Sequence, residues 1–169
     1  MPHTKCINAY SINLRKSNIA LVDTIKNVGK NFIMGIQEVP RDFPAGLNIK
    51  TFKTPRSRTA IVIKGNIDAT MISQLCNADI TTALIHFNTD NGLEKFLFIS
   101  LYIPCKKQPD LRLALKAVEY ARVHGHELIL ASDTNSHSSL WGYERSDQRG
   151  ESVEDFLIAG GLEVLPMIG

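Results

Sequence analysis

The spacing of apolar residues changes along the chain, and each spacing predicts a different element. Near the N-terminus, a loose alternation of apolar and polar residues over 5–13 and an apolar run over 32–37 predict two strands. Between them, a period of three to four residues predicts a helix that Ser17 caps and Gly29 ends. Its expected buried face consists of Ile19, Val22, Ile25 and Val28. Such a strand–helix–strand unit brings the polar ends of both strands to one edge of a sheet.

The middle of the chain has no helical period. Short runs rich in β-branched residues follow one another, separated by turn residues, at 47–52, 59–63, 67–72, 80–87 and 96–103. Asn91 and Gly92 tolerate positive φ angles and predict a hairpin turn. We therefore expect an antiparallel meander in this region.

Helical spacing returns in the last third of the chain. Pro109 and Asp110 open a predicted helix that Gly125 ends. Its expected buried positions are Leu111, Ala114, Leu115, Val118 and Ala121. A strand at 127–131, a helix at 151–159 and a strand at 162–165 should follow, and the helix should bury Val153, Phe156 and Leu157. Helices and strands alternate at both ends of the chain, which predicts an α/β fold of two packed sheets flanked by helices.

Composition restricts the class of protein. The 169 residues are 44% hydrophobic and 21% charged, which is typical of one globular domain spanning residues 1–169. The net charge of +2 permits binding to a polyanion without requiring it. Cys6, Cys76 and Cys105 lack the spacing of a zinc site. No apolar run is long enough for a signal peptide or a membrane span, so we expect an intracellular protein without a membrane partner.

Candidate chemistry is concentrated in residues 128–142. A short apolar run there leads directly into a polar cluster with a carboxylate, an amide, an imidazole and several hydroxyls. Asp133 and Asn135 are two residues apart, so in an extended segment they point to the same side of the chain. Together they could handle a proton or a metal ion and donate a hydrogen bond to a phosphate.

This segment also carries a family resemblance. Asp133-x-Asn135-x-His137-Ser138-x-Leu140-Trp141-Gly142, then Asp147-x-Arg149-Gly150, resembles the endonuclease/exonuclease/phosphatase superfamily, and most of all the apurinic-type endonuclease domain of non-LTR retrotransposons. Three earlier motifs agree in order with that branch: Asn13-Leu14-Arg15-x-Ser17, Ile36-Gln37-Glu38-x-Pro40 and Ser100-x-Tyr102-x-Pro104. The resemblance implies a four-layer sandwich of two mixed β-sheets flanked by helices.

The resemblance also implies a reaction and a set of site residues. The expected activity is metal-dependent nicking of DNA, with Mg²⁺, or Mn²⁺ as the alternative ion, held by Glu38 and Asn13. Asp133 would position or deprotonate the attacking water, Asn135 would hold the scissile phosphate, and Tyr102 would lie against it. A surface glutamate, turn residues and a packed strand tyrosine are the ordinary alternatives for single members of this set.

Other polar residues receive smaller roles. Arg56, Arg58, Lys106 and Lys107 flank predicted strand ends and could contact DNA phosphates, although solvated surface charge is the ordinary explanation for any one of them. The Trp141 indole should pack in the core, the His137 imidazole should bond to the backbone, and Asp147 and Arg149 should form an ion pair that braces the loop. His86, His124 and His126 show no motif and receive no role.

The end of the chain leaves several alternatives open. In this family two later motifs supply a further carboxylate and a histidine, and neither follows within the 169 residues. We therefore expect a domain that lacks its last strands at the C-terminus and that self-associates through unpaired sheet edges. The candidate functions are a retrotransposon endonuclease fused to or derived from a reverse transcriptase, a catalytically dead remnant that binds nucleic acid, and a phosphatase of the same superfamily. Action on chromosomal DNA would require nuclear entry, and the sequence has no basic targeting cluster.

Overall fold

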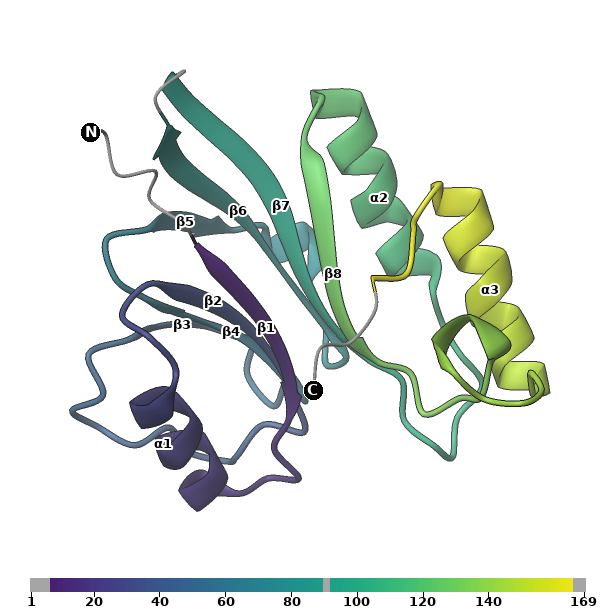
Figure 1. The fold of residues 1–169 in the computed structure, drawn as a ribbon, viewed down its shortest axis with the longest axis horizontal. Helices are drawn as coiled ribbons and strands as arrows, with labels where there is room; N and C mark the ends of the chain where they lie inside the picture. The colour runs from purple at the N-terminus through teal and green to yellow at the C-terminus, as the bar shows by residue number, and fades with distance from the viewer. Residues whose placement is uncertain (1–6, 90–91, 166–169) are drawn as a thin grey trace.

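Two four-stranded sheets pack face to face in the computed structural model, which describes residues 7–89 and 92–165 (Figure 1). The strand orders are β1-β2-β4-β3 and β5-β6-β7-β8. The strands are β1 (Asn8–Asn13), β2 (Phe32–Gln37), β3 (Lys50–Phe52), β4 (Thr59–Lys64), β5 (Asp68–Met71), β6 (Ile80–Thr89), β7 (Gly92–Tyr102) and β8 (Glu127–Asp133). The helices are α1 (Asn18–Asn27), α2 (Arg112–His124) and α3 (Gln148–Gly160), with short 3₁₀ turns η1 (Ser73–Leu75) and η2 (Ser139–Trp141).

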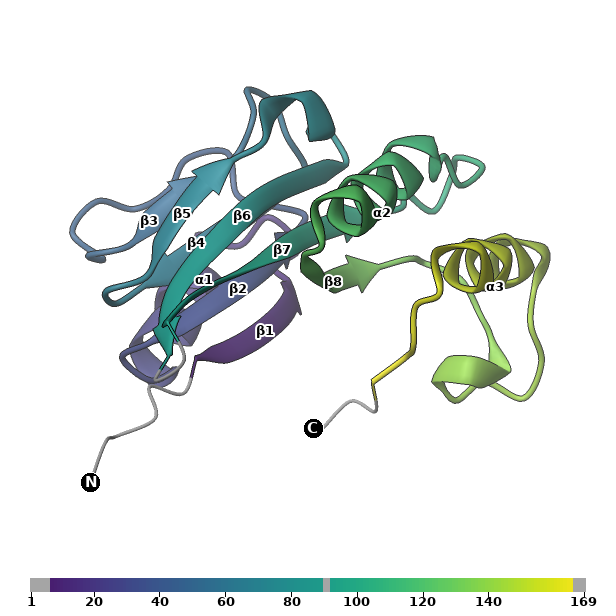
Figure 2. The same ribbon diagram turned by 90° about the horizontal axis from the view of Figure 1, so that it is seen from above.

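Helices cover the outer face of each sheet. Helix α1 packs on the β1–β4 sheet, while α2 and α3 pack on the β5–β8 sheet (Figure 2). A third apolar cluster, which includes Ile33, Ile61, Ile85 and Phe98, lies between the two sheets. This arrangement confirms the predicted α/β fold of two mixed sheets flanked by helices in four layers. No helix in the described part of the chain is long and apolar enough to cross a membrane.

Two parallel strand pairs set the position of the polar strand ends. Strand β1 runs parallel to β2, with Asn13 opposite Gln37, and β7 runs parallel to β8, with Tyr102 opposite Asp133. Helices α1 and α2 provide the two crossovers that parallel pairs require. All four strands therefore end on the same side of the molecule, in the lower part of Figure 1.

Buried hydrogen bonds of Gln37 join the two sheets next to these strand ends. Gln37 is 1% exposed, and its amide donates to Ser100 Oγ at 3.1 Å and to the carbonyl of Ala131 at 3.3 Å. The two sheets also approach closely at Gly35, where a Cβ atom would lie 2.6 Å from Cβ of Ala131. The strands beneath the polar ends are thus fixed relative to one another by packing and by hydrogen bonds.

Some expected elements differ in the structure. The predicted meander divides between the sheets, because β3 and β4 join the first sheet while β5, β6 and β7 form an antiparallel run in the second. The strand expected at residues 162–165 is wrong, since that segment follows α3 without pairing. Helix α3 begins at Gln148, earlier than predicted, because Asp147 caps it. Asn91 and Cys6 lie outside the described residues.

The expected helix faces were also partly wrong. Ile19 is 81% exposed, whereas Ile25 is buried as predicted, and Leu21 is buried beside it. In α2, Leu115 is 44% exposed and Ala117 is buried in its place. Both helices follow the 3.6-residue period, but more than one apolar stripe fits the sequence. The sheet beneath each helix decides which stripe is covered.

Candidate active site

Asn13 joins two carboxylates that are far apart in the sequence. Its side-chain NH₂ group donates to Glu38 Oε1 at 3.0 Å and to Asp133 Oδ2 at 2.5 Å. Because both oxygens lie within hydrogen-bond reach of one nitrogen, the two carboxylates face the same small volume. Three residues predicted to form the site, from the ends of β1, β2 and β8, are therefore in one place.

The orientation of the Asn13 amide is set by its other end. Its Oδ1 atom accepts a hydrogen bond from the backbone N–H of Arg15 at 2.8 Å, so the NH₂ group faces the carboxylates. An NH₂ group donates hydrogen bonds and does not ligate a metal ion. The ligand role of Asn13 stays a prediction, and this geometry favours a residue that aligns Glu38 and Asp133.

Tyr102 reaches the same site from the end of β7. Its hydroxyl donates to Glu38 Oε1 at 3.2 Å, and its side chain is 8% exposed. Burial, followed by the negative charge and hydrogen bond of Glu38, raises the pKa of Tyr102 to about 12. Tyr102 is therefore a neutral hydrogen-bond donor at physiological pH and not a base.

Asn135 lies beside Asp133 but is held by the backbone. Its N–H donates to Asp133 Oδ1 at 3.2 Å, and its side-chain NH₂ group donates to the carbonyl of Ile103 at 3.0 Å. Asn135 and Glu38 both adopt left-handed conformations, with φ angles of 46° and 49°. Such conformations are unfavourable for a glutamate, and they persist where surrounding contacts fix the backbone. At Glu38 the carbonyl accepts a 2.8 Å hydrogen bond from the N–H of Lys16.

The donor set fits a small, hard metal ion. Glu38 and Asp133 offer carboxylate oxygens, and Mg²⁺ typically binds through one or two carboxylates while keeping several waters. Among the described residues, no group of three or more His, Cys, Asp and Glu side chains is placed to enclose a metal ion. The site therefore suits an ion that keeps part of its water shell and is poorly suited to a closed structural site such as that of zinc.

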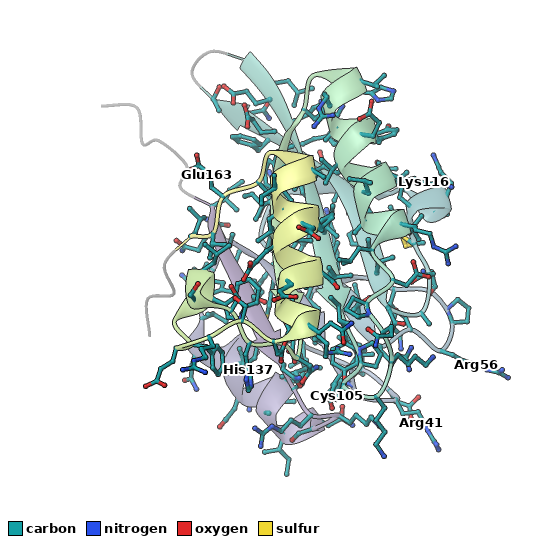
Figure 3. The ribbon with its side chains drawn as sticks, turned by 90° about the vertical axis from the view of Figure 1, so that its right-hand side faces the viewer. Arg41, Arg56, Cys105, Lys116, His137 and Glu163 are labelled. Carbon is teal, nitrogen blue, oxygen red and sulfur yellow. The ribbon has the colours of Figure 1, made fainter. Side chains whose placement is uncertain are left out.

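The four predicted DNA-contacting cations differ in their surroundings. Arg58 forms a bidentate ion pair with Asp79, with nitrogen–oxygen distances of 2.5 and 2.6 Å, and this pair raises the pKa of Arg58. Arg56, Lys106 and Lys107 are exposed. Figure 3 shows Arg56, with Arg41, Cys105 and His137, at the end of the molecule where the strands converge. The exposed cations thus lie on loops at this end, while the charge of Arg58 is already compensated.

Sequence reasoning missed two further cations at the site. Arg15 and Lys16 are exposed and follow Asn13 directly, in left-handed conformations with φ angles of 48° and 62°. Their backbone N–H groups bind Asn13 and Glu38. The signal was available, because Arg15 belongs to the motif that contains Asn13, but nothing in the sequence indicates the tight turn that brings both backbone N–H groups to Asn13 and Glu38.

The ion pair predicted in the motif Asp147-x-Arg149-Gly150 is wrong. Among the described residues, Asp147 and Arg149 form no ion pair with each other. Asp147 caps α3 by accepting from the N–H of Gly150 at 2.6 Å, and it also accepts from the N–H of His137. These hydrogen bonds lower the pKa of Asp147. Arg149 instead donates to backbone carbonyls in the two loops that follow β7 and β8.

His137 and Trp141 order the loop in different ways. The exposed His137 ring stacks on Tyr143, with centroids 4.2 Å apart, and within residues 7–89 and 92–165 the imidazole makes no hydrogen bond to the backbone, contrary to expectation. The Trp141 indole is half-buried against the α2–α3 cluster and donates to the carbonyl of Ser136 at 3.0 Å. Both residues stabilise the segment after β8.

Comparisons with known proteins agree with this architecture. Residues 96–168 match the protein family described as endonuclease-reverse transcriptase. The fold is similar to that of the endonuclease domain of TRAS1, a telomere-specific non-LTR retrotransposon, with a TM-score of 0.75 and 20% sequence identity. That match covers 94% of this chain and 74% of the TRAS1 domain. No curated protein matches the chain. These comparisons support the resemblance inferred from the motifs: residues 96–168 match that family, and the fold is that of an endonuclease domain.

Proposed function

From the match to endonuclease-reverse transcriptases, we propose that this domain nicks DNA by metal-dependent hydrolysis of a phosphodiester bond. Mg²⁺ is the proposed ion, and Mn²⁺ is the alternative. The observation that carries the proposal is the hydrogen-bonded group of Glu38, Asn13 and Asp133, which places two carboxylates around one volume at the strand ends. Hydrolysis of a phosphodiester needs such a concentration of oxygen ligands, and also a group that can accept a proton from water.

Each site residue has a distinct task in this proposal. A metal ion, when bound at Glu38, supplies positive charge to the phosphoryl oxygens. Asp133 orients the attacking water and accepts its proton, because its carboxylate is held by Asn13 on one oxygen and by the Asn135 backbone on the other. Tyr102, neutral with a pKa of about 12, donates its hydrogen bond to Glu38 and lies against the phosphate. Asn135 holds the phosphate with the second N–H of its side-chain amide, since the first donates to the carbonyl of Ile103.

The exposed cations would bind the DNA backbone. Arg15, Lys16, Arg56, Lys106 and Lys107 lie on three loops at the strand ends and are exposed. Contacts of this kind position DNA without reading its sequence, and each neutralised phosphate makes binding more sensitive to salt. We propose DNA as the partner, in the context of a reverse transcriptase, with action on chromosomal DNA requiring nuclear entry.

Nicking of supercoiled plasmid tests the proposal. The wild-type protein should convert plasmid to the open-circular form with Mg²⁺ and not with EDTA, and Glu38→Gln and Asp133→Asn should each abolish this conversion. Glu127→Gln is the matched control, because Glu127 is an exposed carboxylate at the opposite end of the same strand as Asp133. Equal loss in the control would contradict a specific site.

Two other outcomes identify the alternative functions. Plasmid binding by a folded wild-type protein, without nicking in Mg²⁺ or Mn²⁺, would indicate a nucleic-acid-binding domain without catalysis. Metal-dependent release of phosphate from a soluble phosphomonoester, again without nicking, would indicate a phosphatase. Either result overturns the endonuclease proposal.

A further inference from the structure

The Arg149 guanidinium binds four backbone carbonyl groups. Its Nε atom donates to Asn135 at 3.0 Å, and Nη2 donates to Pro104 at 3.1 Å and to Thr134 at 3.3 Å. Its Nη1 atom donates to the carbonyl of Lys107. Backbone carbonyls in loops lack the partners that a sheet provides, so a fork of N–H donors satisfies several of them at once.

These four carbonyls belong to two loops that flank the candidate site. Pro104 and Lys107 lie in the loop that follows Tyr102, and Thr134 and Asn135 lie in the loop that follows Asp133. The strands are already joined at this level, because the N–H of Ile103 donates to the carbonyl of Asp133 at 2.9 Å. Arg149 extends that connection beyond the ends of the strands, where the sheet no longer holds the chain.

The start of α3 fixes the position of the guanidinium. Asp147 caps the helix, and its backbone N–H donates to the carbonyl of His137 at 3.0 Å. A Cβ atom at Gly150 would lie 1.8 Å from the same carbonyl oxygen, so only glycine allows the helix to approach the loop this closely. Three residues at the start of α3 therefore act together. Asp147 caps the helix, and Gly150 lets the helix approach the loop closely enough for Arg149 to bind both sets of carbonyls.

We propose that Arg149 is a positioning residue for the nuclease reaction. By holding the loops after β7 and β8 together, Arg149 fixes the positions of Asn135, Lys106 and Lys107 relative to Asp133. The inference rests on the proposed function for its catalytic consequence. It predicts that Arg149 contributes through orientation, because its donors are engaged by the protein backbone. A misplacement of about 1 Å in a reacting group can lower a rate about 100-fold.

Lysine is the informative substitution at this position. Arg149→Lys keeps the positive charge but offers one nitrogen in place of a planar fork, so it cannot reach both loops together. We expect kcat for plasmid nicking to fall about 100-fold, while KM changes less than about threefold, since cationic charge largely sets the affinity for DNA. In Arg149→Ala, added guanidinium chloride should restore part of the rate relative to the same concentration of NaCl. Arg145→Lys is the matched control, because Arg145 is exposed in the same segment.

Hydrogen exchange of backbone amides tests the clamp without relying on activity. In Arg149→Lys, the amides of Lys107 and Asn135 should exchange at least about tenfold faster, while those of β2 and β7 should be unchanged. An unaltered exchange rate in both loops would overturn the inference whatever happens to nicking. Faster exchange with unchanged kcat would overturn the catalytic part. If the wild-type protein does not nick DNA, the proposed function fails and hydrogen exchange alone decides whether Arg149 holds the loops.

Discussion

Ionisable side chains gather at both ends of the two sheets, but they are held in different ways. At the strand ends that form the candidate site, Asn13 and Tyr102 both donate to Glu38, and Asn13 also donates to Asp133. At the opposite end, His124 stacks between Tyr120 and His126, with ring centroids 4.0 and 6.0 Å away. Among the described residues, buried Nε2 of His86 has no hydrogen-bond partner.

Hydrogen bonding distinguishes the candidate active site at one end of the sheets from the histidine cluster at the other. The far end combines three imidazoles with Lys95, and the burial of His126 and the neighbouring positive charges lower its pKa. The His124 ring mainly contacts other rings, those of Tyr120 and His126. The site end combines carboxylates with donors that fix their direction, which is what catalysis by preorganised polar groups requires. Organisation by hydrogen bonds, and not the number of titratable residues, distinguishes the candidate site.

The largest expected effect is on catalysis. Asp133→Asn should lower the rate of plasmid nicking about 10²- to 10⁴-fold, which is the usual contribution of a general base. His126→Gln should leave the rate within about twofold, because the far end contributes no group to the reaction. Single-turnover nicking with saturating Mg²⁺ measures both. A comparable loss of nicking rate in His126→Gln would contradict the assignment of catalysis to the site end alone.

Stability should respond in opposite directions at the two ends. Gln37→Leu should lower the free energy of unfolding by about 2–4 kcal/mol, because Ser100 and the Ala131 carbonyl lose a buried partner. His86→Leu should raise it by about 1 kcal/mol, since Nε2 of His86 is buried without a hydrogen bond. Urea denaturation followed by circular dichroism measures both changes. If His86→Leu lowered the free energy of unfolding as much as Gln37→Leu, His86 would have hydrogen bonds as stabilising as those of Gln37.

Alkaline pH should lower the free energy of unfolding, because it deprotonates Tyr102 at the candidate site. Its pKa is about 12 in the folded protein, above its ordinary value of 10, so folding favours the neutral phenol. The corresponding stability, about 3 kcal/mol at 1.36 kcal/mol per pKa unit, is present below pH 10 and is lost as the pH rises toward 12. The difference in unfolding free energy between wild type and Tyr102→Phe should therefore change by that amount across this range. A difference that stays constant with pH would contradict the assigned environment of Tyr102.

Acidic pH should weaken the far end through His126. Its pKa is lowered from 6.5 in the folded protein, so protonation favours the unfolded state. The stability linked to His126 is present above pH 6.5 and decreases as the pH falls below that value. His126→Gln should reduce this loss slightly in thermal melts between pH 7 and pH 5. A steeper loss in the variant would contradict the sign.

Much of the architecture could be predicted because its causes are local. The capping of α1 by Ser17, the left-handed Gly125 after α2 and the run of β2 all lie where the sequence indicated. The motifs likewise predicted that Asn13, Glu38, Tyr102 and Asp133 share a site. Propensity, capping and alternation act over a few residues, so the sequence carries them directly.

Only the tertiary structure decided how these elements meet. Asn13 and Asp133 are 120 residues apart, and their contact depends on two parallel strand pairs packed face to face. The acceptors of Arg149 are backbone carbonyls, which every residue possesses, so no side-chain pattern could reveal them and an ion pair with Asp147 was predicted instead. The sequence by itself predicted which residues gather at the candidate site. Their partners were decided by long-range packing, because a guanidinium or an amide binds whichever acceptor the fold brings within reach.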